Sequence, residues 1–177
     1  MTHRAATVAV IIIEGYLYWR YRQLGAEFHF WLHGLFGGAI GVAAATAWAL
    51  LRRRRPRPVW ASGFAGHVYA AFPDVLLLSA GVLHHLWMDV FAFHIALHFI
   101  PAPLVTMLVF FGLTLLAWLL ATWDRPRVAA GALALGVAVS TVALLMASPL
   151  PTTVDQLRQQ PQIALLCPLA GVEVASR

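Results

Sequence analysis

The chain consists of long apolar runs separated by short polar segments. Runs of about 18 or more nearly uncharged residues predict membrane-spanning helices, because a helix rises about 1.5 Å per residue through a hydrocarbon core of about 30 Å. We therefore predict an all-α, polytopic membrane helix bundle with about five transmembrane helices. Glycine and alanine are frequent in the second run, where they would allow close helix packing. The expected spans cover residues 5–21, 28–51, 59–83, 104–123 and 128–148.

One segment between the third and fourth runs departs from this pattern. Residues 84–100 carry five ionisable side chains and end before Pro101 and Pro103, so the segment is too polar to face lipid. We expect a re-entrant or interfacial histidine-rich helix that the spans shelter. The predicted organisation is a transmembrane bundle over residues 1–149 and a short extramembrane C-terminal tail over residues 150–177.

Arginines concentrate between the apolar runs and give the chain a formal net charge of +5. Residues 52–57 alone contribute five of them, directly after the second run. Arginine-rich loops are typical of the cytoplasmic side, which predicts an integral inner (plasma) membrane protein with a cytoplasmic N-terminus. This placement favours membrane lipids as partners and argues against nucleic acid, while the oligomeric state stays open.

The histidines and carboxylates show a regular spacing that suggests metal binding. Three pairs stand four residues apart, which places both members on one helix face, as in two-ligand contributions to a metal. The predicted topology brings all three pairs near the outer membrane face. Cys167 is the only cysteine, so thiolate sites and intrachain disulfides are excluded. The expected ligands to one or two divalent ions, with zinc as the best match and manganese or iron still open, are His29, His33, His85, Asp89, His94 and His98.

The sequence leaves open the directions of the histidine pairs and the partners of two carboxylates. On one straight helix, the pair at residues 85 and 89 and the pair at residues 94 and 98 point in nearly opposite directions. They can serve one metal only if the helix breaks between Asp89 and His94; without a break, one pair would contact another group, such as Glu27. Asp74 and Glu14 are expected near mid-membrane, where a charge needs a partner. For these two carboxylates, a functional role and a structural polar pair with His67 are equal alternatives.

A resemblance accompanies these motifs. Residues 66–74, which read GHVYAAFPD, lie between the helix start at residues 33–38 and the spacing His85-x-x-x-Asp89. This arrangement resembles bacterial inner-membrane proteins described as metal-dependent hydrolases, and the resemblance covers residues 29–98. Leu76 stands where that family has a second aspartate, and the family's His-Arg-Gly-x-Thr-His-Ser segment is absent. The resemblance implies hydrolysis at a metal site.

The leading hypothesis is a membrane metalloenzyme. A bound metal would lower the pKa of a water molecule to about 7, and the hydroxide would attack an ester or phosphoester of a lipid-borne substrate. Glu27 and Asp74 are the candidate proton-transfer groups. A non-enzymatic accessory subunit and a proton or metal-ion carrier are the alternatives from another class. The spacing of His84 and His85 from His98 also leaves a haem-binding electron-transfer protein open.

Overall fold

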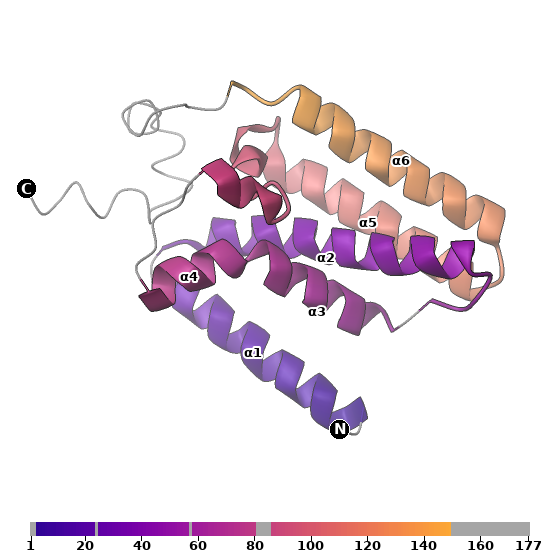
Figure 1. Ribbon diagram of the computed structural model, residues 1–177, viewed down its shortest axis with the longest axis horizontal. Coiled ribbons are helices and arrows are strands. Elements are labelled where there is room, and N and C mark those ends of the chain that lie inside the picture. The colour runs from indigo at the N-terminus through magenta and orange to yellow at the C-terminus, as the bar shows by residue number, and fades with distance from the viewer. Residues whose placement is uncertain (1–2, 24, 57, 81–85, 150–177) are drawn as a thin grey trace, which may run out of the picture. The chain divides into compact units, whose positions relative to one another are not determined.

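The computed structural model describes residues 3–23, 25–56, 58–80 and 86–149, and all regular structure within these ranges is helical (Figure 1). This confirms the all-α prediction; the expected C-terminal tail and His85 lie outside the described residues. The chain divides into two compact units, with the boundary between residues 31 and 32 inside one helix. The helices are α1 (His3–Gln23), α2 (Glu27–Leu51), α3 (Val59–Ala70), α4 (Phe72–Ala80), α5 (Pro103–Thr122) and α6 (Pro126–Leu145), with short 3-10 helices η1 (Leu86–Val90) and η2 (Ala96–Phe99).

Three helices in the described residues, α2, α5 and α6, are long and apolar enough to cross a membrane. The expected count of about five spans is not confirmed. Helix α1 covers the first expected span but carries Glu14, Arg20 and Arg22. The third expected span is divided into α3 and α4, of 12 and 9 residues, each shorter than the roughly 20 residues that a spanning helix needs.

The division between α3 and α4 has its cause in Pro73. A proline has no backbone N–H, so residue 73 cannot donate the helical hydrogen bond to the carbonyl of Tyr69, and its ring disfavours a continuous helix. Helix α3 ends at Ala70, and the N–H of Ala71 donates back to the carbonyl of His67 over 2.8 Å. The break places Asp74 in the first turn of α4.

In the first unit, aromatic side chains of α1 pack on the start of α2. Tyr21, Ala26 and Phe30 form a buried cluster, with Leu17 and Tyr18 packed against it. The rings of Tyr18 and Phe30 meet edge to face with centroids 5.3 Å apart. The connection between the two helices is short, and the N–H of Ala26 donates to the carbonyl of Tyr21 over 2.9 Å.

In the second unit, glycines let α2 and α3 approach closely, as the sequence predicts. A Cβ atom built on Gly66 of α3 would overlap the carbonyl of Gly37 and lie 2.8 Å from the backbone nitrogen of Gly41, both on α2. No side chain therefore fits at this crossing, and the two backbones meet directly.

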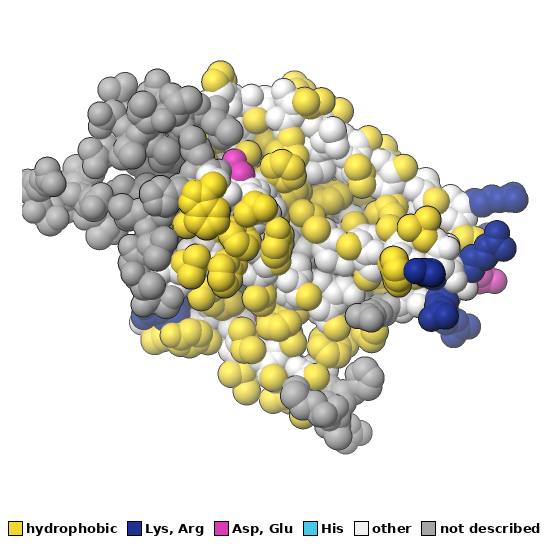
Figure 2. Space-filling view, viewed as in Figure 1, with side chains coloured by type: hydrophobic (Ala, Val, Ile, Leu, Met, Phe, Trp, Pro, Cys, Tyr) yellow, Lys and Arg dark blue, Asp and Glu magenta, His cyan; other side chains and the backbone are white. Residues whose placement is uncertain are grey.

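Helices α5 and α6 complete the second unit as an antiparallel pair beside α2 (Figure 1). Gly136 of α6 faces Phe110 and Leu113 of α5, and Gly38 of α2 faces Phe111. Hydrophobic side chains cover much of the face in Figure 2, and arginines gather at the end where α2 finishes and α5 turns into α6. On the face shown, the second unit is therefore apolar along its helices and basic at the end where α5 turns into α6.

Replacing Gly66 by alanine should lower the midpoint of thermal unfolding in detergent, because the added methyl group overlaps α2 and overpacking costs roughly 1–3 kcal/mol. Gly112→Ala on α5 is the matched control, since nothing lies within 4 Å of a Cβ at that position. Equal midpoints for the two variants would contradict the close crossing of α2 and α3.

Candidate metal centre

Helix α2 supplies two histidines from its first turns. His29 and His33 lie one turn apart and are 1% and 0% exposed, respectively. The ring of Tyr21 stacks beside His29, with centroids 6.1 Å apart and an interplanar angle of 24°. The four-residue spacing therefore places both imidazoles on one face, as predicted, with both rings buried.

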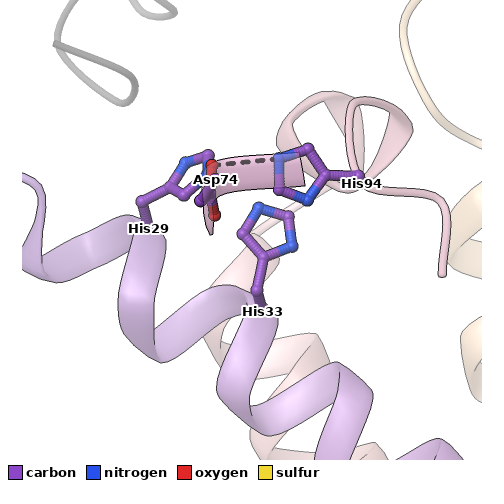
Figure 3. A group of neighbouring side chains, drawn as sticks. All are labelled: His29, His33, Asp74 and His94. Atoms are coloured by element: carbon purple, nitrogen blue, oxygen red, sulfur yellow. Dashed lines mark ion pairs between the residues drawn. The ribbon is translucent and has the colours of Figure 1, made fainter. Parts of the chain in front are cut away.

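Asp74 reaches the site from the first turn of α4, directly after the break between α3 and α4. It stands directly after Pro73 and is 0% exposed. Its Oδ1 atom lies 3.3 Å from Nε2 of His94 (Figure 3). His94 is therefore one partner of this buried carboxylate. His67, which the sequence offered as an alternative partner, lies against Gly34 on α2.

His94 lies in a non-helical turn between η1 and η2. Ala92 and Phe93, with φ values of 58° and 53°, adopt the left-handed conformation that non-glycine residues rarely take. The chain therefore breaks between Asp89 and His94, which is the condition under which His94 can leave the direction of a continuous helix.

The carboxylate of Asp89 stabilises this turn. Its Oδ1 accepts hydrogen bonds from the N–H groups of Ile95 and Ala96, over 2.7 and 3.0 Å. The N–H of Phe93 donates to the Asp89 carbonyl over 2.8 Å. Asp89, expected as a metal ligand, thus uses one carboxylate oxygen to fix the backbone next to His94.

A hydrogen bond to the backbone sets the ring of His94. Its Nδ1 lies 2.9 Å from the carbonyl oxygen of Ala70, the last residue of α3. Because a carbonyl only accepts, Nδ1 must donate, and the neutral ring then presents a lone pair at Nε2. Metal-binding histidines typically donate their second N–H to a carbonyl or carboxylate in this way. Nε2 of His94 is therefore prepared as a ligand atom.

The distance between His94 and Asp74 is compatible with an ion pair and with two ligands of one ion. Charge-assisted N–H···O bonds are about 2.7–2.9 Å long, shorter than the 3.3 Å between Nε2 of His94 and Oδ1 of Asp74. Two ligand atoms about 2.0–2.1 Å from one tetrahedral zinc ion lie about 3.3–3.4 Å from each other. The distance between the two atoms is close to such an edge.

Three histidines and one aspartate meet at this point. One ligand atom from each residue lies within 4.8 Å of the other three, and all four residues are buried. Closing a tetrahedron of that size around an ion would move each atom inward by about 1 Å or less. Figure 3 shows the four side chains converging from α2, α4 and the turn before η2: His29, His33, Asp74 and His94.

The imidazole rings are packed against one another. His33 and His94 stack with centroids 3.9 Å apart and an interplanar angle of 13°, and His98 meets His33 edge-on at 5.4 Å. His98 contacts the group through the ring of His33.

The structure thus brings together His29, His33 and His94 from the expected ligands and adds Asp74, which the sequence suggested for proton transfer. Asp89 and His98 lie next to the group, in the roles given above. Glu27 is half-buried in the first turn of α2. The sequence signal for Asp74 was a carboxylate within an apolar run, expected near mid-membrane, where a charge needs a partner.

Fold and site together define an all-α protein with membrane-like helices and a buried group of three histidines and one aspartate that can hold a metal ion. In comparisons with protein-family models, curated proteins and solved structures, nothing matches the chain. Its function is therefore inferred from the geometry of the site.

Removing the carboxylate of Asp89 should loosen the turn that carries His94. We expect Asp89→Ala to destabilise the protein by about 1.5–3 kcal/mol, the range for hydrogen bonds to a charged group. Asp89→Asn keeps an acceptor oxygen and should lose less, as measured by thermal unfolding in detergent. Bound metal should follow the same order. A folded Asp89→Asn variant that has lost its metal would instead make Asp89 a ligand.

Proposed function

We propose that this protein is a membrane-embedded metalloprotein that binds one divalent transition-metal ion through His29, His33, Asp74 and His94. The observation that carries the proposal is the arrangement of His94, whose Nδ1 is bound to the Ala70 carbonyl and whose Nε2 lies 3.3 Å from Asp74. Burial of all four residues supports a dedicated site, because a charged side chain inside a membrane protein is retained where it serves a function.

Zinc is the ion that this donor set fits best. Three imidazole nitrogens disfavour magnesium and calcium, which take oxygen ligands. Four ligands from histidine and aspartate match the tetrahedral geometry of zinc. Manganese and iron prefer more ligands than the four that meet here.

We also propose an orientation for the site. Helix α2 has 25 residues and is about 37 Å long, with the two histidines in its first turns and the arginines of residues 52–55 after its other end. If the arginines are cytoplasmic, the metal centre lies toward the opposite face of the inner membrane. A cytoplasmic N-terminus is consistent with this direction of α2.

Metal-dependent hydrolysis is the second candidate function, and Asp74 is the observation that favours it. Three imidazoles suffice to hold a catalytic zinc ion, with water in the fourth position. Such an ion would supply an activated water as nucleophile for the ester or phosphoester of a lipid-borne substrate, and Asp74 would accept the proton of that water. As the bond to the alcohol breaks, Asp74 would pass this proton to the leaving oxygen. The resemblance of residues 29–98 to bacterial inner-membrane metal-dependent hydrolases, which rests on short motifs, implies the same activity.

Metal analysis of purified protein tests the binding site. We expect about one zinc ion per chain in the wild type and at least a tenfold loss of affinity in His94→Ala, because the ion loses one of its ligands. Mass spectrometry after dialysis against a competing chelator measures the zinc, and size-exclusion chromatography checks folding. His67→Ala, a buried histidine outside the group, is the control. Equal zinc in wild type, His94→Ala and His67→Ala would refute the site.

Asp74→Asn separates binding from hydrolysis. If the protein is a hydrolase, the zinc-loaded variant should keep its metal through three imidazoles but lose at least about a hundredfold in rate, the effect of removing a general base. The assay follows release of p-nitrophenol from acyl and phosphoryl esters in mixed micelles. Absence of turnover by the zinc-loaded wild type would refute the hydrolase proposal and leave the metal-binding proposal intact.

A further inference from the structure

A second feature lies at the arginine-rich end of the second unit, where α5 turns into α6. Leu120, Trp123, Arg125 and Val128 line an open hollow of about 490 Å³. The turn is short, and the N–H of Arg125 donates to the carbonyl of Leu120 over 2.9 Å. The hollow therefore belongs to a well-defined helix connection.

The lining combines three kinds of chemistry. Leu120 and Val128 give apolar walls that continue the surfaces of α5 and α6. Trp123 is 65% exposed, and an exposed tryptophan at a helix end is typical of the membrane–water interface. Arg125 adds a guanidinium, which forms paired hydrogen bonds with phosphate oxygens. A phospholipid presents the same sequence of groups, from acyl chain through glycerol to phosphate.

The location agrees with this chemistry. Both α5 and α6 are candidate membrane spans, so their connection lies at the depth of the lipid headgroups. Asp124 carries the negative charge nearest to Arg125 along the chain, and it is outnumbered by arginines at the same end (Figure 2). Arg52 lies over the ring of Trp48, 4.5 Å from its centroid. The local charge is therefore positive, which complements an anionic lipid.

We propose that this hollow is a binding site for one anionic phospholipid, with the phosphate at Arg125, the glycerol beside Trp123 and the upper acyl chain along Leu120 and Val128. The proposal is independent of the metal centre, because it uses none of the same residues. It assigns one specific lipid to the arginine-rich end, in addition to the general attraction between arginines and an anionic membrane surface.

Native mass spectrometry of the full-length protein in detergent tests the site, with phosphatidylglycerol and phosphatidylcholine as probes. We expect the wild type to retain one phosphatidylglycerol more tightly than phosphatidylcholine. Arg125→Gln should weaken phosphatidylglycerol binding about fivefold, the effect of one arginine at a membrane surface. Arg125→Lys should keep most of the preference for the anionic lipid. Arg22→Gln, an exposed arginine on α1, is the matched control and should change nothing.

Two further measurements distinguish the hollow from its surroundings. Val128→Trp keeps every charge but fills the hollow, so it should weaken binding of the same lipid. Displacement of the lipid by glycerol phosphate would show a site for soluble anions and overturn the proposal. Weaker phosphatidylglycerol binding after neutralising residues 52–55, with no change in Arg125→Gln, would show a diffuse charge effect and would also overturn the proposal.

Discussion

The hydrogen bond between His94 and the carbonyl of Ala70 is the interaction on which the candidate metal centre depends. Ala70 ends α3, and the last carbonyls of a helix lack partners within that helix. The imidazole satisfies one of them and is thereby held with its other nitrogen toward Asp74. Because the hydroxyl of Tyr69 also donates to the carbonyl of Val90, the end of α3 is joined twice to the segment that carries His94.

The position of this helix end is itself set by packing and by proline. Gly37, Gly41 and Gly66 bring the backbones of α2 and α3 into direct contact, which fixes the distance between His33 and the end of α3. Pro73 ends α3 and starts a new helix, so Asp74 follows another direction than a continuous helix would give. Glycine and proline residues, which supply no ligand atoms, thus set the geometry of the histidines and the aspartate.

Local spacing predicted the part of the site that lies on a regular helix, namely His29 and His33 on α2. The spacing also placed His94 among the expected ligands, on condition that the helix breaks after Asp89. It could not predict the turn that makes this break, because the turn depends on left-handed backbone at Ala92 and Phe93, residue types that give no signal for this conformation. Hydropathy predicted the helical class and the long helices α2, α5 and α6. It joined α3 and α4 into one span, because hydrophobicity alone does not register a break at a proline.

The position of the four candidate ligands along the chain has a consequence for biogenesis. All four lie between residues 29 and 94, upstream of α5 and α6. During synthesis, a nascent chain that has emerged as far as the turn at His94 already holds every donor atom. If these four residues hold a metal ion, its insertion can therefore precede the synthesis of α5 and α6, the two most apolar of the candidate membrane spans.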